Sequence, residues 1–282
     1  MEIRNIAAAR DVPIVAVGAW KYEVEVWNAK SATKISSFPT QLEPGGQRLA
    51  ISHDGTRVAA AAFEKNGLSM FDGESGHLAW TRSDLQQIQK LTWSHDGGRI
   101  YCGVGNELLH CIDITSGATL ETIEAVSTRI DSPFGNAYLL DGEQLHVQLK
   151  SGKSFSPRRE TFAVLDAAFG VDTVAIAESG GSVRILSLDS GRDVARYTPE
   201  NGVHALQLAY YAKRNAYLAL LWPYQHGGSK RLVKIDSTSG RVSTIAVVGQ
   251  PAETGFSTPL GALVCSTGEL VELESGRRRS FR

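Results

Sequence analysis

The chain has 282 residues, of which 42% are hydrophobic, so it can bury a core and a disordered chain is excluded. Lysine and arginine number 29 against 30 aspartates and glutamates, a formal net charge of −1. No overall charge therefore attracts the chain to nucleic acid or to an anionic membrane. The 28 glycines exceed the usual share of about 7% and indicate many turns.

The cysteines, Cys102, Cys111 and Cys265, are too few for a disulfide scaffold. The N-terminal segment lacks the basic stretch and long apolar run of a secretory signal peptide. The chain also lacks a run of about 18 uninterrupted apolar residues, so no membrane-spanning helix is predicted. We therefore expect a protein of the reducing cytoplasm with no membrane partner.

A short segment recurs along the chain: an apolar residue, often an aspartate, a spacer, and then Ser-Gly. Three copies are complete, one has its aspartate displaced, one lacks the glycine and two are shortened. In that order they are 71–76, 112–117, 235–240, 186–191, 27–32, 149–152 and 273–276. An aspartate side chain caps such a turn, and Ser-Gly supplies the positive φ that closes a tight hairpin. Each copy therefore predicts a turn between two strands.

The serines of these seven copies recur every 35 to 49 residues, about 41 on average. Four-stranded propeller blades repeat at roughly 40–45 residues. We therefore predict an all-β, seven-bladed β-propeller, with four antiparallel strands per blade in a pseudo-sevenfold ring around a central channel. It would be a single domain, 1–282, with blades at approximately 1–40, 41–84, 85–125, 126–157, 158–199, 200–249 and 250–282.

The second repeat shows the expected blade most clearly. The segment 49–55 ends in Ser-His-Asp-Gly and runs into an alanine-rich strand, and 91–97 repeats this pattern. We predict strands A to D, from the axis outward, at 47–52, 57–63, 68–72 and 77–82. The first blade begins near Ile3 and the last ends near Phe281, so no strand exchange between them is expected.

Two repeats resemble those of known propellers. The segment 109–117 (Leu-His-Cys-Ile-Asp-Ile-Thr-Ser-Gly), followed by Thr-Leu-Glu-Thr-Ile at 119–123, resembles the YVTN repeat. The segment 69–80 is similar to a quinoprotein-type repeat that ends in a docking tryptophan, here Trp80. Over nearly its whole length the chain resembles bacterial-style propellers of the WD-repeat-like, YVTN-repeat or quinoprotein-like superfamily. No blade closes with a Trp-Asp dipeptide, and the resemblance implies a fold rather than a function.

Three chemical-looking motifs are interpreted as turns. Ser52-His53-Asp54 and Ser94-His95-Asp96 contain the residue types of a hydrolase triad, but a triad must converge from different chain positions. Both stand at the same point of the repeat and precede a glycine, which favours a turn. Gly152-Lys153-Ser154 lacks the first glycine and the helix of a phosphate-binding loop, so it is predicted to be a hairpin.

Metal or catalytic ligands in a propeller must converge on the central channel from several blades. The polar candidates on inner strands are Asn5, Asp131, Asp166 and His204. Four such residues from four blades are about what chance supplies, so we predict no catalytic residue, no metal site and no cofactor. Cys102 and Cys111 are expected on paired strands B and C of the third blade, as buried thiols rather than a redox pair.

The connections between strands B and C, and between strand D and the next strand A, lie on one face of a propeller. Most predicted B–C turns are short, but those of blades one and six are longer and aromatic. Tryptophan, tyrosine and arginine dominate binding hot spots, although each tryptophan could instead end its strand and cover the blade edge. The predicted partner-binding residues are Trp20, Lys21, Tyr22, Arg129, Arg158, Arg159, Trp222, Tyr224, His226 and Lys230.

The sequence favours a non-enzymatic, monomeric module that binds another protein through loops on one face. A more specific hypothesis is an immunity- or inhibitor-type protein that neutralises a toxin or an enzyme. Nucleic acid is not expected as a partner, because no basic patch interleaved with aromatic residues accompanies Arg277–Arg279. The alternative is a propeller hydrolase of the lactonase or sugar-lactone type, or a quinoprotein-like relative without its cofactor.

Overall fold

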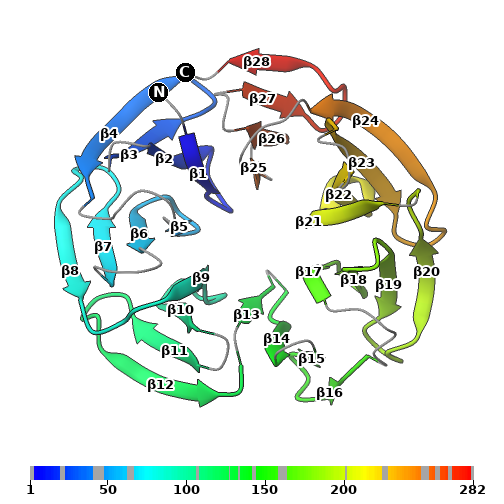
Figure 1. The fold of residues 1–282 in the computed structure, drawn as a ribbon, viewed down its shortest axis with the longest axis horizontal. Helices are drawn as coiled ribbons and strands as arrows, with labels where there is room; N and C mark the ends of the chain where they lie inside the picture. The colour runs from blue at the N-terminus through cyan, green and yellow to red at the C-terminus, as the bar shows by residue number, and fades with distance from the viewer. Residues whose placement is uncertain are drawn as a thin grey trace. The chain divides into compact units, whose positions relative to one another are not determined.

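The computed structural model describes residues 3–19, 23–40, 48–61, 67–105, 108–126, 128–132, 134–141, 144–157, 164–200, 202–223, 228–248, 254–257, 261–265 and 269–280. The strands in these ranges form seven four-stranded sheets, each made of four consecutive strands (Figure 1). The predicted all-β, seven-bladed propeller with four antiparallel strands per blade is therefore confirmed, and the sheets are called blades 1 to 7. No helix in the described part of the chain could span a membrane.

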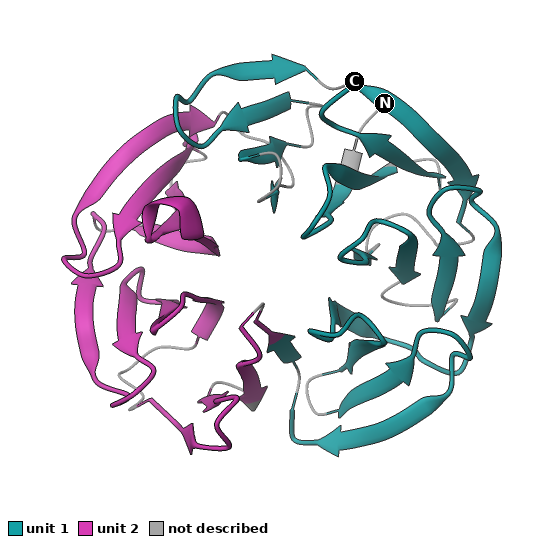
Figure 2. Ribbon diagram, turned by 180° about the vertical axis from the view of Figure 1, so that it is seen from behind, with its two compact units in different colours: residues 1–130, 251–282 teal, residues 131–250 magenta. Residues whose placement is uncertain are grey.

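The blades fall into two compact units, which Figure 2 colours separately. Unit 1 comprises residues 1–130 and 251–282, and unit 2 comprises residues 131–250. Blades 1, 2, 3 and 7 belong to unit 1, whereas blades 5 and 6 and most of blade 4 belong to unit 2. The prediction of one domain with the blade boundaries given above stays a prediction.

In unit 1 the strands are, for blade 1, β1 (Ile3–Ala8), β2 (Ile14–Ala19), β3 (Glu23–Asn28) and β4 (Thr33–Pro39); for blade 2, β5 (Arg48–Ile51), β6 (Arg57–Ala61), β7 (Leu68–Asp72) and β8 (Leu78–Arg82); for blade 3, β9 (Ile88–Trp93), β10 (Arg99–Val104), β11 (Leu108–Asp113) and β12 (Thr119–Glu124); and for blade 7, β25 (Thr254–Ser257), β26 (Ala262–Cys265), β27 (Glu269–Glu272) and β28 (Arg278–Ser280). In blade 2, every predicted strand is present.

Blade 4 contains β13 (Thr128–Asp131), which begins in the last residues of unit 1, then β14 (Ala137–Asp141), β15 (Gln144–Gln148) and β16 (Ser154–Phe155). Blade 5 contains β17 (Val164–Phe169), β18 (Thr173–Glu178), β19 (Val183–Ser187) and β20 (Asp193–Tyr197). Blade 6 has β21 (Val203–Tyr211), the 3₁₀ turn η1 (Ala212–Arg214), β22 (Ala216–Pro223), β23 (Lys230–Asp236) and β24 (Val242–Val248).

The turn between the third and fourth strands has the chemistry that the repeat predicts. In blade 2, Asp72 Oδ1 accepts hydrogen bonds from the backbone N–H groups of Glu74 and Ser75, and also from the Ser75 hydroxyl. Gly76 then closes the turn with a φ of +72°. The same arrangement surrounds Asp113 and Asp236. The recurrent aspartate is therefore a turn cap in all three complete copies.

The imperfect copies keep this turn with other side chains. Asn28 accepts the two N–H bonds in blade 1, and the Ser187 hydroxyl accepts them in blade 5. Ala32 adopts the positive φ of +56° where the other copies have glycine. The displaced Asp189 is therefore not the cap, because Ser187 has taken its position.

The fourth strand of five blades contains a β-bulge. In each, one residue of the fourth strand has no partner in the third strand, and the register shifts by one there. The extra residues are Ile35, Ala79, Leu120, Val194 and Ile245.

Aromatic side chains of unit 1 join neighbouring blades. Trp80 of blade 2 donates a hydrogen bond from Nε1 to the Ile114 carbonyl of blade 3 at 2.8 Å. Its ring fills the space beside Gly117, where an added Cβ would lie 2.9 Å from the nearest ring atom. Phe38 of blade 1 covers Gly76 of blade 2 in the same way. Trp80 is therefore a docking side chain, as the resemblance implied.

The first and last blades pack through apolar side chains and exchange no strand. Ile6, Val15 and Val17 of blade 1 form one buried cluster with Ala262, Val264 and Leu270 of blade 7. Each of these two blades is also completed by its own four strands. The expectation that strand exchange is absent is therefore confirmed for these sheets.

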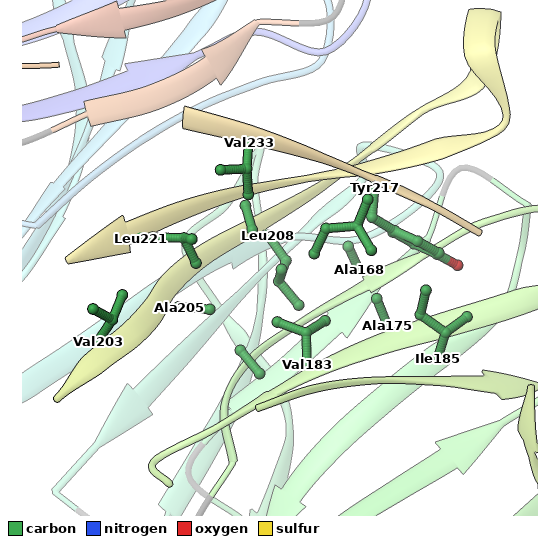
Figure 3. Close-up of a cluster of buried hydrophobic side chains, with 13 residues drawn as sticks. Ala168, Ala175, Val183, Ile185, Val203, Ala205, Leu208, Tyr217, Leu221 and Val233 are labelled. Atoms are coloured by element: carbon green, nitrogen blue, oxygen red, sulfur yellow. The ribbon is translucent and has the colours of Figure 1, made fainter. Parts of the chain in front are cut away.

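The core of unit 2 lies between blades 5 and 6 (Figure 3). Ala168, Ala175 and Ile185 of blade 5 face Leu208 and Tyr217 of blade 6, as Figure 3 shows. Small residues in the first strands of blade 5 leave room for the Tyr217 ring, which is fully buried. This core fixes the strands of blade 6 that carry the candidate surface described below.

Candidate interaction surface

The two Ser-His-Asp segments are turns, as the sequence predicts. The Ser52 hydroxyl donates to Asp54 Oδ1 at 2.6 Å and accepts the N–H of Arg57 at 2.9 Å. His53 does not activate Ser52, because its Nε2 bonds the Ser94 carbonyl of blade 3 at 2.8 Å. The Ser94 turn repeats these contacts with Asp96 and Arg99.

The third chemical-looking motif is also a turn, and the two cysteines of blade 3 are buried thiols. Leu149 donates its N–H to the Lys153 carbonyl at 2.8 Å, and Gly152 has a φ of +85°, so this segment is a hairpin turn. Cys102 and Cys111 lie on the paired strands β10 and β11 and are free and buried. Burial raises the pKa of the Cys102 thiol to about 12, so it stays protonated at neutral pH.

Asp166, one of the four polar candidates on first strands, bonds to both neighbouring blades. Its carboxylate accepts the backbone N–H of Leu208 at 2.8 Å and the hydroxyl of Tyr138 at 3.4 Å. Burial, and then the charge of Asp166, raise the pKa of Tyr138. Asp166 thus ties blade 5 to blades 4 and 6.

Within the described residues, no group of three or more histidine, cysteine, aspartate or glutamate side chains could hold a metal ion. The absence of metal and cofactor stays a prediction.

Seven of the ten predicted partner-binding residues lie outside the described residues. They are Trp20, Lys21, Tyr22, Arg158, Arg159, Tyr224 and His226. The role predicted for them stays a prediction.

Arg129 lies within β13, whereas the sequence places it in the connection before that strand. Its guanidinium carbon is 5.0 Å from the centre of the Tyr101 ring, and its carbonyl accepts a hydrogen bond from the Thr92 hydroxyl. A cation stacked on a ring gains electrostatic attraction from the ring face. Arg129 therefore contacts blade 3 through both its side chain and its backbone.

Trp222 and Lys230 come together at the B–C end of blade 6. Trp222 is the second-to-last residue of β22, and Lys230 is the first residue of β23. Trp222 follows Leu221 and Lys230 precedes Arg231, and Leu221 and Arg231 are paired across the two strands. Trp222 and Lys230 are thus the next opposed positions towards the turn between β22 and β23. Since directly opposed residues of neighbouring strands project from the same face, Trp222 and Lys230 share one face of the sheet. Both side chains are half-buried.

His204 joins this face, and the sequence reasoning did not place it there. It is paired directly with Trp222 across β21 and β22 and is also half-buried. We call the set of His204, Trp222 and Lys230 the Trp222 face. The register that aligns His204 with Trp222 depends on a shift in strand pairing between Ala205 and Gln207. No local sequence motif predicts this shift.

The opposite face of the same sheet carries a different set of groups. Arg231 pairs with Glu200 at 3.3 Å, where the Glu200 side chain is 77% exposed. Burial raises the pKa of Tyr197, and the nearby Arg231 charge opposes that shift. Such an exposed ion pair contributes on the order of 0–1 kcal/mol. Arg231 is therefore useful as a control position for the Trp222 face.

Neither a family model nor a curated protein matches this chain. Among solved structures, it is similar to the WD40 repeats of RRP9, with 13% identity over 94% of this chain and 87% of that one, at a TM-score of 0.70. It is also similar to U3-55K, with 14% identity, coverage of 94% and 88%, and a TM-score of 0.68. The C-terminal WD40 domain of Sif2 is 13% identical, with coverage of 95% and 92% and a TM-score of 0.66. At these identities the likeness shows the fold, a WD40-like seven-bladed β-propeller.

Proposed function

We propose that this chain is a non-enzymatic interaction module and that a partner protein binds it at the Trp222 face. The observation that carries the proposal is the register of blade 6, which puts His204, Trp222 and Lys230 side by side at one strand end. The WD40-like fold supports the proposal, because propellers present strand ends and loops on a rigid frame.

The physical argument rests on the half-buried state of Trp222. A large aromatic ring that is partly fixed by its own sheet loses little side-chain entropy when a partner covers the rest. The imidazole of His204 and the ammonium of Lys230 then supply polar groups around the apolar contact, as at the rim of a protein interface. The positive charge of Lys230 favours a partner with a carboxylate opposite it.

A finer form of the proposal is that the partner is a toxin or another enzyme that this chain inhibits in the cytoplasm as a monomer. The near-neutral net charge of −1 supports recognition through a local patch rather than through a long-range field. An enzyme target predicts that its activity falls in proportion to complex formation. Sedimentation of the purified chain checks the monomer.

The experiment is affinity purification with the wild-type chain, Trp222→Ala and the control Arg231→Ala. Arg231 lies on the opposite face of the same strands, so its loss leaves the Trp222 face intact. We expect Trp222→Ala to weaken capture of a specific protein at least tenfold, while Arg231→Ala and wild type retain it. Equal capture by all three proteins, with matched thermal unfolding, would remove the Trp222 face as the site.

The second candidate is a hydrolase of the lactonase kind, for which the observation is the set of polar residues on first strands of unit 2. Asp131, Asp166 and His204 come from blades 4, 5 and 6. Asp166 already accepts two hydrogen bonds from neighbouring blades, which favours a structural role. Metal analysis and a lactone and ester panel test it: turnover that is lost in Asp166→Asn would replace the interaction proposal.

A further inference from the structure

The A–B turns of blades 4, 5 and 6 form a partly exposed aromatic surface in unit 2. Phe134, in the turn after β13, meets Tyr210 near the end of β21 edge-on, with ring centres 6.0 Å apart. The centre of the Tyr210 ring in turn lies 5.4 Å from the centre of the buried Tyr217 ring. Phe134 and Tyr210 are both half-buried, so part of each ring faces solvent.

The turn of blade 5 is held tightly against these rings. The Gly170 N–H donates to the Tyr217 hydroxyl oxygen at 3.1 Å. A Cβ at Gly170 would lie 2.7 Å from that oxygen and 2.9 Å from Tyr210 Cε2, so only glycine fits here. The following residue, Val171, is 55% exposed. The packing of Gly170 therefore fixes the backbone directly before the exposed apolar side chain of Val171, one residue along the chain from the contact with Tyr210.

Basic side chains flank the aromatic surface on two sides. The Tyr210 hydroxyl donates to Asn215 Oδ1 at 2.8 Å and thereby holds the end of η1, in which Lys213 and Arg214 are exposed. On the other side, the stem of Lys150 packs 3.1 Å from the Cβ position of Gly135, the neighbour of Phe134. Asp172, also exposed, follows Val171. The flanking charge is thus mainly positive.

We propose that Phe134, Val171, Tyr210, Lys213 and Arg214 form a second docking site, which binds an acidic segment of a partner protein. The segment would place an apolar or aromatic side chain on the rings and Val171, while its carboxylates face Lys213 and Arg214. Charge complementarity selects this occupant. A nucleic acid fits less well, because Asp172 adjoins the surface and the whole chain has a net charge of −1.

This site is separate from the Trp222 face, so the two proposals fail independently. Tyr217 is near the start of β22 and Trp222 near its end, five residues along the strand, or about 17 Å at the usual rise per residue. A variant of one site leaves the other unchanged.

The test is a selection of displayed random 12-residue peptides on the folded full chain, followed by direct binding of the recovered peptides. The site variants are Lys213→Glu/Arg214→Glu and Val171→Asp, all at exposed positions where folding should be unaffected. The matched control is Arg192→Glu/Arg241→Glu, which changes the net charge equally at two exposed turns of blades 5 and 6. A twelve-nucleotide oligouridylate is tested in parallel.

We expect recovered peptides with a net negative charge and at least one large apolar residue. Their affinity should fall about tenfold in each site variant, should be unchanged in the control and in Trp222→Ala, and should weaken as salt is added. The proposal is overturned if no peptide is enriched, or if enriched peptides bind the site variants as well as they bind wild type. It is also overturned if the oligonucleotide binds more tightly than the peptides do.

Discussion

The turns between the first and second strands contact the next blade differently in blades 1 to 3 of unit 1 and in blades 5 and 6 of unit 2. In blades 1 to 3 these contacts are polar: the Asp11 N–H donates to the His53 carbonyl at 2.9 Å, and His53 Nε2 bonds the Ser94 carbonyl at 2.8 Å. These bonds connect blades 1, 2 and 3 in series. In unit 2 the contact is aromatic, because Tyr217 of blade 6 reaches back to the Gly170 N–H and the Thr173 hydroxyl of blade 5.

Neighbouring blades are therefore joined at these turns in two ways, by polar turn residues or by a buried tyrosine. Only the first can be recognised from the sequence. The polar turn is encoded within four consecutive residues and repeats, so it can be recognised by inspection. The aromatic contact joins residues 44 and 47 positions apart, and neither end has a distinctive local pattern. The polar turn depends on hydrogen bonds of modest net value, whereas the aromatic contact buries a whole ring.

The largest expected effect tests the aromatic contact. Tyr217→Ala removes a fully buried ring, so we expect a loss of roughly 3–5 kcal/mol in the free energy of unfolding. Tyr217→Phe should cost only about 0.5–1.5 kcal/mol, because it removes the hydrogen bond between the Tyr217 and Thr173 hydroxyls, while the Gly170 N–H keeps the Thr173 carbonyl as its acceptor. Urea unfolding measures both. A loss below about 1 kcal/mol for Tyr217→Ala would contradict the importance given to this ring.

The polar turn should contribute less. Ser52→Ala removes the acceptor of the Arg57 N–H and the donor to Asp54, so we expect a loss of about 1–2 kcal/mol. Ser243→Ala, at an exposed position of β24, is the control and should change stability by less than about 0.5 kcal/mol. If Ser52→Ala cost as much as Tyr217→Ala, the contrast between the two units would not hold.

The two kinds of turn should also differ in their response to acid. Burial lowers the pKa of His53 from its usual 6.5, although the bond to Ser94 opposes this. The unfolded chain therefore takes up a proton near pH 6.5 while folded His53 is still neutral, so stability falls as the pH drops through this range. His53→Gln should flatten the loss of unfolding free energy between pH 7.5 and 5.5. An unchanged slope would show that His53 does not titrate differently on folding.

The smallest effect is expected from removing residues 277–282. These include β28, whose described side chains are exposed, and they leave both kinds of turn and the apolar contact of blades 1 and 7 intact. We expect only the outer edge of blade 7 to fray, with a loss of about 1 kcal/mol or less and a fall in Tm of no more than about 4 °C. A collapse of Tm would mean that this segment stabilises far more than its own edge.

The fold could be predicted from the sequence because the residues that form its turns, an aspartate followed by Ser-Gly, recur along the chain. Asp72, Asp113 and Asp236 cap their turns through local bonds, so these copies identify the repeat, and the seven copies together give the blade count. The imperfect copies were harder to interpret, since a hydroxyl at Ser187 can replace the carboxylate without leaving a pattern. Local bonds need only local sequence, and this explains the success with the strands of blade 2.

The candidate surface could be predicted only in part. Trp222 and Lys230 were identified by residue type, but their association with His204 depends on strand register. Arg129 was misplaced by a few residues, because a short strand such as β13 gives little periodicity from which to set its start. The surface of Phe134 and Tyr210 joins turns of blades that are not neighbours in sequence, and no motif marks it.

The bulged fourth strands have a consequence for the protein in concentrated solution. Each described blade ends in a fourth strand that pairs with a strand on one side only. Such an edge strand is a template for side-to-side pairing with the sheet of another molecule. An extra residue such as Leu120 or Val194 interrupts the even spacing of the backbone N–H and C=O groups of this strand and increases the local twist. A straight incoming strand then cannot match the edge over its length. The bulges in the fourth strands therefore help to prevent edge-to-edge pairing of β-sheets between molecules.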